Sequence, residues 1–192
     1  MILYLHGFRS SPKSMKARLV GERMAALGLA DHLICPQLPA SPRQAMELAL
    51  SLVDGIPAAE LSIVGSSLGG YYATWLAERL GCRAVLLNPA VVPSLDLDRH
   101  VGVTTQYHSD DPFEFKREYI DELRALAVER ITRPARYFLI AATGDEVLDY
   151  RDMVAHYQGA RQHIIQGSDH AISEFADYLD PVLSFCGVEA RS

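Results

Sequence analysis

The chain has few cysteines and no excess of basic residues. Its 192 residues include three cysteines, Cys35, Cys82 and Cys186, which lie far apart and show no Cys-x-x-Cys spacing. A disulfide framework and a structural zinc site are therefore not expected, and each cysteine is interpreted as a small apolar residue of the core. The net charge of −6 argues against a duplex nucleic-acid binder, which would usually carry a basic patch.

Long apolar runs are also missing. No run approaches the roughly 20 apolar residues that a membrane-spanning helix needs, and the acidic balance gives no support to binding of anionic membranes. The start "MILYLHG" has no basic segment ahead of its apolar residues, so no secretory signal is expected there. Together with the scattered cysteines, these absences predict a cytoplasmic protein without nucleic-acid or membrane partners.

Short apolar runs alternate regularly with longer amphipathic ones, and no repeat or low-complexity tract interrupts them. The short runs are apolar at both alternating positions, which is typical of strands covered by helices on both faces. The expected strands are Ile2–Leu5, Leu33–Cys35, Leu61–Val64, Ala84–Leu87, Arg136–Ala141 and His163–Ile165. We therefore predict one α/β domain over residues 1–192, with a mostly parallel sheet of about six strands in three layers.

Several short signals mark the expected helix ends. Ser11-Pro12 and Ser41-Pro42 each place an N-cap residue before a proline, and Gly81 is expected to stop a helix. An apolar stripe over residues 172–179 predicts a last helix that kinks or restarts at Asp180-Pro181.

The interval from Pro89 to Pro134 contains no clear strand. Its second half, "FEFKREYIDELRALAVERI", has apolar residues at helical spacing and predicts a crossover helix. Residues 93–115 are expected to form either a surface loop or a small cap over the site, and they are too few for a separate lid domain.

The stretch "IVGSSLGGYY" contains the motif Gly-x-Ser-x-Gly, with Gly65 and Gly69 on either side of Ser67. It follows a predicted strand and opens a predicted helix, the context in which this motif carries a nucleophilic serine on a sharp turn. Side chains at the flanking positions would collide with neighbouring backbone, which explains the glycines. The register selects Ser67 as the nucleophile and leaves Ser66 a structural role.

An acid and a base follow the serine in the order Ser…Asp…His, which is the order in hydrolases whose nucleophile lies in a Gly-x-Ser-x-Gly turn. Of seven histidines, only His170 lies between the last predicted strand and the last long helix, where the base is expected. Asp145 lies just beyond a strongly apolar strand, between the serine and the histidine in chain order. Glu146 should project away from the site if Asp145 projects inward. Asp149 is better explained as the N-cap of a helix, but it stays an alternative acid.

An oxyanion hole is expected from two backbone N–H groups. One belongs to Leu68, which follows the nucleophile, and the other to Phe8, in the loop after the first strand. His6 is interpreted as a residue that supports this loop through hydrogen bonds, rather than as a second base.

Candidate substrate contacts follow other predicted strands, because ligands of open parallel sheets bind at the carboxyl ends of the strands. Arg9, Gln37 and Asn88 have such positions, and Arg9 would suit an anionic group. Tyr71, early in the helix after the serine, is a candidate wall of an acyl pocket. For each of the four residues, an ordinary structural role is the alternative.

Several of these blocks together resemble one known family. "LYLHGFRSSP", "PQLP", "GSSLGGYYATWL", "NPAVVP", "TGDEVLDYR" and "DHA" are similar to the small YqiA-type esterases of the α/β-hydrolase superfamily, over nearly the whole chain. The resemblance implies a minimal α/β-hydrolase fold with little or no cap. It also implies Ser67, Asp145 and His170 at the triad positions, and hydrolysis of carboxylic esters without a cofactor or a metal.

The sequence therefore predicts a serine esterase whose partner is a small acyl ester, with a preference for short acyl chains. Hydrolysis of acyl thioesters by the same triad is the first alternative. A non-catalytic binding module on the hydrolase fold is less well supported, because all three triad members are present. A haloalkane dehalogenase would need an aspartate in place of Ser67, and the sequence barely separates an esterase from a peptidase.

Overall fold

The computed structural model describes residues 1–91, 101–105 and 112–188, and its centre is a parallel sheet of six strands. The strands follow one another across the sheet in the order β2-β1-β3-β4-β7-β8, with every neighbouring pair parallel. Their bounds are β1 Ile2–Leu5, β2 Leu33–Ile34, β3 Ser62–Ser66, β4 Arg83–Leu87, β7 Tyr137–Ala142 and β8 Arg161–Ile165. The six predicted strands are thus confirmed, with ends shifted by one or two residues.

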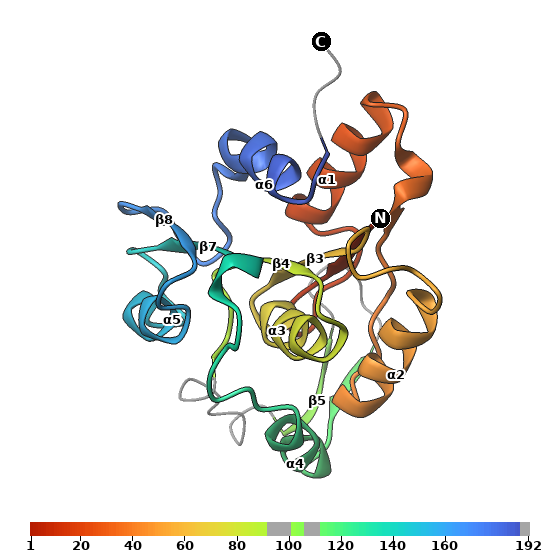
Figure 1. Cartoon of the computed structure of the whole chain (residues 1–192). Coiled ribbons are helices and arrows are strands. Elements are labelled where there is room, and N and C mark those ends of the chain that lie inside the picture. The colour runs from red at the N-terminus through yellow and green to blue at the C-terminus, as the bar shows by residue number, and fades with distance from the viewer. Residues whose placement is uncertain (92–100, 106–111, 189–192) are drawn as a thin grey trace.

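Helices cover both faces of this sheet (Figure 1). On one face lie α1 (Met15–Ala26) and α6 (Leu179–Phe185), and on the other lie α2 (Pro42–Leu52), α3 (Leu68–Leu80) and α5 (Tyr150–His156). A further helix, α4 (Glu118–Ala125), packs against α2, farther from the sheet. The three predicted layers are therefore present.

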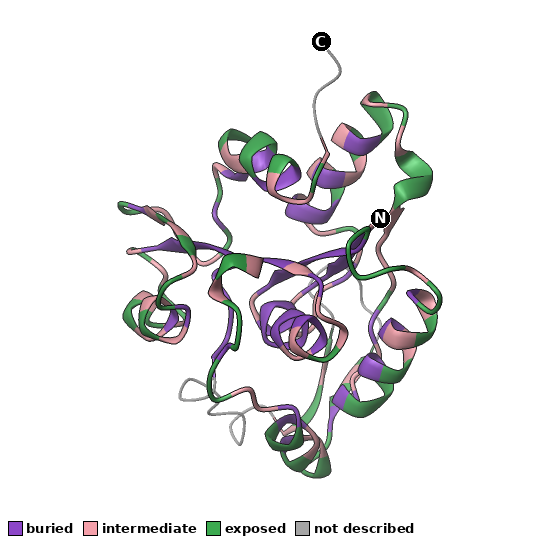
Figure 2. Ribbon diagram, viewed as in Figure 1, coloured by how far each residue is buried: buried purple, intermediate pink, exposed green. Residues whose placement is uncertain are grey.

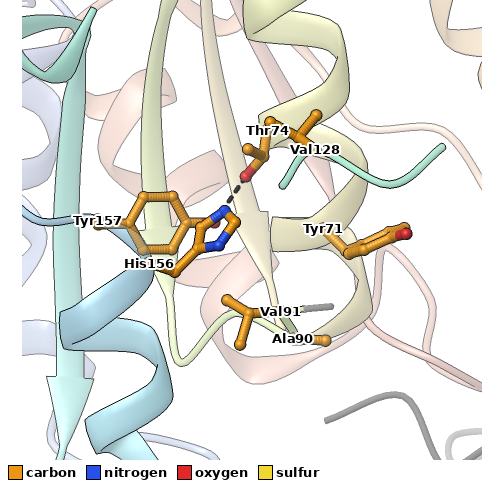
Figure 3. Close-up of a pocket in the computed structure, with 7 residues that line it drawn as sticks. All are labelled: Tyr71, Thr74, Ala90, Val91, Val128, His156 and Tyr157. Carbon is orange, nitrogen blue, oxygen red and sulfur yellow. Dashed lines mark hydrogen bonds between the residues drawn. The ribbon is translucent and has the colours of Figure 1, made fainter. Parts of the chain in front are cut away.

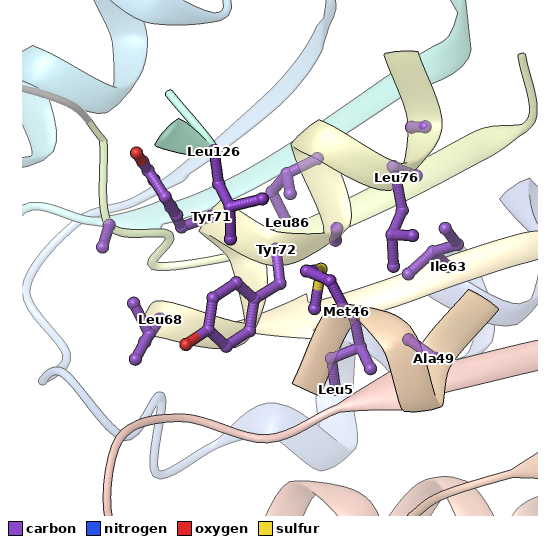
Figure 4. Packing of buried hydrophobic residues seen from close by; sticks show 14 of the residues in the cluster. Leu5, Met46, Ala49, Ile63, Leu68, Tyr71, Tyr72, Leu76, Leu86 and Leu126 are labelled. Atoms are coloured by element: carbon purple, nitrogen blue, oxygen red, sulfur yellow. The ribbon is translucent and has the colours of Figure 1, made fainter. Parts of the chain in front are cut away.

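The core consists of two apolar clusters, one on each side of the sheet. Successive strand residues point to opposite faces, so Ile63 joins the cluster under α2 and α3 while Val64 joins the cluster under α1 and α6. Figure 4 shows Ile63 close to Leu76 of α3, on the side of the sheet where Met46 of α2 packs. Burial is concentrated on the strands and on the inner sides of the helices (Figure 2). This double burial explains why the strands are apolar at both alternating positions.

The first helix begins three residues later than the Ser11-Pro12 pair predicts. Residues 11–14 form a turn, in which the Ser11 hydroxyl accepts a hydrogen bond from the Lys13 N–H at 3.1 Å and the Ser11 carbonyl accepts one from the Ser14 N–H. Serine favours such local turns as readily as helix caps, and α1 then starts at Met15. At the second pair the prediction is confirmed, since the Ser41 hydroxyl caps α2 by accepting from the Gln44 N–H.

The crossover helix is shorter than predicted at both ends, because its first residues belong to a strand and α4 already ends at Ala125. β5 (Gly102–Thr105) and β6 (Pro112–Phe115) form a separate antiparallel pair, called the β5–β6 hairpin below. In β6, Phe115 is buried and Glu114 is exposed, an alternation typical of a strand. Of the predicted loop or cap over residues 93–115, residues 93–100 and 106–111 lie outside the described residues.

At the C-terminal end, the α-helix begins only at Leu179, later than the apolar stripe over residues 172–179 predicts. A 3₁₀ turn over Phe175–Tyr178 leads into α6, and Asp180 and Pro181 lie in its first turn. Proline is tolerated there because the N–H that it lacks would have no partner within the helix. No helix in the described part of the chain is both long and apolar enough to cross a membrane.

Candidate active site

Ser67 occupies a strained turn between β3 and α3. Its backbone has φ 55° and ψ −122°, a conformation that residues with side chains rarely adopt. A Cβ atom on Gly65 would lie 2.2 Å from the Gly69 carbonyl oxygen, and one on Gly69 would lie 2.0 Å from the Leu5 carbonyl oxygen. Only glycine fits at either position. The turn leaves Ser67 partly exposed, whereas Ser66 is buried with 7% of its surface exposed.

His170 and Asp145 lie in line with the Ser67 hydroxyl. The Oγ of Ser67 is 3.0 Å from Nε2 of His170, and Nδ1 of His170 is 2.8 Å from Oδ2 of Asp145. A carboxylate can only accept, so Nδ1 carries the proton and Nε2 is free to accept from the serine. The Asp145 side chain is 1% exposed and the imidazole is 22% exposed. The three residues predicted for the triad are thus brought together at the carboxyl ends of β3, β7 and β8.

Hydrogen bonds hold both carboxylate oxygens of Asp145 in place. Its Oδ1 accepts from the N–H groups of Val147 and Leu148, at 2.8 and 2.9 Å, while Oδ2 faces the imidazole. Asp149, the alternative acid, instead caps α5, where it accepts from the Arg151 N–H at 2.9 Å. The geometry therefore favours Asp145 as the partner of His170.

Glu146 does not project away from the site as predicted. Its Oε2 accepts a hydrogen bond from the backbone N–H of His170 at 2.9 Å. The prediction considered only the alternation of side chains along a strand. Residues 143–149 form turns, however, and in a turn a neighbour of Asp145 can also reach the loop of residues 166–174 that carries His170, called the histidine loop below.

Asn88 has a structural role, in place of the substrate contact that its position predicts. The residue is fully buried, and its Nδ2 donates to the carbonyls of Asp169 and His170 at 3.0 and 3.1 Å. Its Oδ1 accepts from the Ala142 N–H at 2.8 Å. Because these bonds occupy the amide within the protein, Asn88 ties the histidine loop to the end of β7.

Asp169, for which the sequence suggests no role, holds the same loop at its next turn. Its carboxylate accepts from the N–H and the hydroxyl of Ser173, at 3.0 and 2.5 Å. The hydroxyl bond is the main reason why the pKa of Asp169 is lowered.

The loop after β1 lies against the nucleophile. A Cβ atom on Gly7 would be 3.2 Å from the Cβ of Ser67, so the Gly7–Phe8 backbone passes directly beside the serine. The N–H of Leu68 is the first of α3, and such groups lack a partner within the helix. The assignment of the N–H groups of Leu68 and Phe8 as the two oxyanion donors stays a prediction.

His6 supports this loop through hydrogen bonds, as the sequence predicts. Its Nε2 accepts from the Leu38 N–H at 3.0 Å, and Nδ1 lies 2.9 Å from the Gly7 carbonyl oxygen. Gln37, a candidate substrate contact, contributes to the same loop, because its Nε2 donates to the Ser10 carbonyl at 3.2 Å and lies 3.3 Å from Nε2 of His6.

The β5–β6 hairpin packs on the loop that carries Phe8 and Arg9. The Phe8 ring meets Phe113 and Phe115 edge to face, with centroid distances of 5.1 and 5.2 Å. The guanidinium of Arg9, another candidate substrate contact, donates from Nε to the Thr105 carbonyl at 2.7 Å. The sequence prediction missed this hairpin, although the alternation Phe113-Glu114-Phe115 was a signal for a strand.

Tyr71 also has a structural partner, because its hydroxyl donates to the Leu123 carbonyl of α4 at 2.8 Å. It lines a small pocket (Figure 3). The other lining residues are Thr74, Ala90, Val91, Val128, His156 and Tyr157. The hydroxyls of Thr74 and Tyr157 pair with each other at 2.7 Å. Since the lining includes no triad side chain, we interpret the pocket as a gap in packing.

No metal site is evident among the residues that the structure describes, because no three His, Cys, Asp or Glu side chains gather in a way that could hold an ion.

Comparison with known proteins places the whole chain in one family and one fold. A family model described as "Uncharacterised protein family (UPF0227)" matches residues 1–187. A candidate hydrolase from Agrobacterium vitis S4 has a TM-score of 0.73 and 20% identity, covering 96% of this chain and 87% of that chain. Est1E from Butyrivibrio proteoclasticus, with bound ferulic acid, has a TM-score of 0.70 and 14% identity, covering 96% and 86%. A monoacylglycerol lipase from Paleococcus ferrophilus has a TM-score of 0.63 and 15% identity, covering 98% and 94%. At these identities the likeness shows the fold, which is that of α/β hydrolases.

Proposed function

The chain belongs to the UPF0227 family, that of the YqiA-type proteins it resembles, and we propose that it is a serine esterase acting through an acyl-enzyme on Ser67. The single observation that carries the proposal is the continuous relay from Ser67 through His170 to Asp145, with hydrogen-bond distances of 3.0 and 2.8 Å. The neighbours of known structure include an esterase domain and a lipase, which favours acyl transfer over the other reactions that this fold supports.

The reaction begins when Ser67 Oγ attacks the acyl carbon and His170 Nε2 takes its proton. Asp145 keeps the imidazole in the tautomer with the proton on Nδ1 and stabilises the imidazolium that forms. The alcohol then leaves with the proton from Nε2, and water attacks the acyl-enzyme with His170 again as base. The acid is released and the serine regains its proton.

The developing negative charge on the substrate oxygen is assigned to the N–H groups of Leu68 and Phe8. The first begins α3, so the positive end of the helix dipole adds to its effect. The second belongs to the loop that passes beside Ser67 at Gly7. Loss of one such donor typically lowers kcat about 10²–10³-fold.

The natural substrate is proposed to carry a short acyl chain. Of residues 93–115, the structure describes residues 101–105 and 112–115, which include both strands of the β5–β6 hairpin, and Val103 of β5 is 73% exposed. Full burial of each added methylene would be worth about 0.8 kcal/mol, or roughly fourfold in rate. We therefore expect a homologous ester series to rise by less than this per carbon, peak at short chains and show no interfacial activation. A steep rise through long chains would contradict an open site.

The proposal is tested by the turnover of a chromogenic ester such as p-nitrophenyl acetate. Ser67→Ala should lose nearly all turnover and keep its fold by circular dichroism. Ser66→Ala is the matched control one residue away, and it should retain most of the activity. Equal turnover by the wild type and Ser67→Ala would refute the acyl-enzyme. If Ser67→Ala is inactive, turnover of paired ester, thioester and amide substrates by the wild type distinguishes an esterase from a thioesterase or a peptidase.

A further inference from the structure

Lys16 is buried in the first turn of α1, with 8% of its surface exposed. Its ammonium group donates a hydrogen bond to the carbonyl oxygen of Ala171, the residue that follows His170. The contact joins residues 155 positions apart in the chain, and it brings a positive charge to the histidine loop from the helix layer that contains α1 and α6 (Figure 1).

Burial of this ammonium is unfavourable for folding. Loss of hydration lowers the pKa of Lys16 to about 8, although the carboxylates of Asp169 and Asp145 partly offset the effect. An apolar side chain of similar volume at such a position often leaves a protein as stable or makes it more stable. Stability alone therefore does not explain a lysine here.

The bond from Lys16 completes a set of contacts that holds the histidine loop. Glu146 accepts from the His170 N–H, and Asn88 donates to the carbonyls of Asp169 and His170. Lys16 holds the next carbonyl along the chain, that of Ala171. Of these three side chains Lys16 is the positively charged one, and a charge-assisted bond to a carbonyl is stronger than a neutral one.

We propose that Lys16 is a positioning residue for His170, which keeps Nε2 of the imidazole within reach of Ser67 by holding the loop at Ala171. This inference rests on the proposed function. The effect of Lys16 is geometric, because a positive charge near the imidazole would by itself oppose formation of the imidazolium. Removal of the charge alone would thus raise turnover, whereas removal of the positioning contact lowers it.

The test compares Lys16→Met with Lys13→Met, which removes an exposed lysine three residues earlier. For Lys16→Met we expect kcat on p-nitrophenyl acetate to fall by about 10–10²-fold, the range that small misplacement of a reacting group produces. KM should stay within about twofold, since no substrate contact is assigned to Lys16. Lys13→Met should match the wild type. Lys16→Gln, which keeps a neutral N–H donor, should recover part of the lost kcat.

Thermal stability separates positioning from a merely structural role. Ala171 is exposed, so water can replace the ammonium at its carbonyl, and the melting temperature of Lys16→Met should equal or exceed that of the wild type at pH 7. A kcat of Lys16→Met at or above the wild-type value would overturn the proposal. So would a loss of kcat that is matched by a lower melting temperature.

A second readout does not depend on turnover. The proton on His170 Nδ1, bonded to Asp145, should give a low-field proton NMR signal in the wild type and in Lys13→Met. In Lys16→Met the signal should broaden or shift as the loop loosens, and an unchanged signal would contradict the proposal. If the wild type hydrolyses no ester, the esterase proposal fails, while this signal still tests Lys16.

Discussion

The two sides of Ser67 are held by different combinations of contacts. On the side of the acid and the base, buried polar groups fix the geometry, with Asp145 bonded at both oxygens and Asn88 bonded to three backbone groups. On the oxyanion side, hydrogen bonds of His6, Gln37 and Arg9 also hold the loop, and aromatic packing of Phe8 on the β5–β6 hairpin covers it. Hydrogen bonds depend steeply on distance and angle, whereas apolar contact is non-directional. Substitutions that remove the polar contacts of the first side should therefore affect catalysis far more than substitutions of similar size in the aromatic contacts of the second.

The largest effect is expected at the acid. Asp145→Asn should lower kcat by about 10⁴-fold, because the amide can donate to Nδ1 and so favour the wrong imidazole tautomer. Asp149→Asn is the matched control, and it should change kcat little, since asparagine also caps helices. Steady-state kinetics on one ester, with melting curves for both variants, checks the pair. Equal losses of activity at unchanged melting temperatures would remove Asp145 from its assigned role.

Asn88→Asp should have the next largest effect. The substitution keeps the shape but points a carboxylate oxygen, in place of an N–H donor, at the carbonyls of Asp169 and His170. We expect kcat to fall by about 10²-fold through displacement of the histidine loop. The free energy of unfolding should also fall, by about 2–4 kcal/mol, because a buried acceptor loses its partners. Stopped-flow kinetics and urea unfolding measure the two quantities, and a variant with full activity would show that Asn88 does not fix the loop.

Much of this polar side could be predicted from the sequence, and the reason is local. Gly65, Ser67 and Gly69 lie within one turn, and the positions of Asp145 and His170 follow from chain order and from the ends of apolar strands. The structural roles of Asn88 and Arg9 could not be predicted, because their partners lie 81 and 96 residues away. The β5–β6 hairpin was missed for a different reason, since its two phenylalanines also fit the start of a helical pattern.

The pH dependence of stability tests the buried ammonium on the polar side. The pKa of Lys16 is about 8 in the folded chain, below its ordinary value of 10.5. The unfolded chain therefore binds more protons between these values, and stability rises with pH. Relative to Lys16→Met, the wild type should gain about 2 kcal/mol in free energy of unfolding between pH 7.5 and 9.5. Urea unfolding at several pH values measures the difference, and parallel curves for the two proteins would show that Lys16 is hydrated.

The smallest effect is expected for the aromatic contacts on the oxyanion side. Phe8→Leu keeps the backbone N–H assigned to the oxyanion and removes the edge-to-face contacts with Phe113 and Phe115. Such contacts are worth about 0.5–1.5 kcal/mol per pair beyond their buried area, so the melting temperature should fall by a few degrees while kcat changes less than about fivefold. Leu19→Ala, at a half-buried position of α1, is a control for a general loss of packing. A loss of kcat as large as that of Asn88→Asp would mean that both sides need the same accuracy.

The position of the nucleophile can be measured directly by covalent labelling. A fluorophosphonate reacts with an activated serine by forming an oxygen–phosphorus bond and releasing fluoride. Intact mass spectrometry should show one adduct per chain, and peptide mapping should place it on Ser67, with none on the neighbouring Ser66. Labelling should be lost in Ser67→Ala and strongly slowed in His170→Ala, which lacks the base. An adduct on Ser66, or an unlabelled chain that still hydrolyses the ester, would contradict an acyl-enzyme on Ser67.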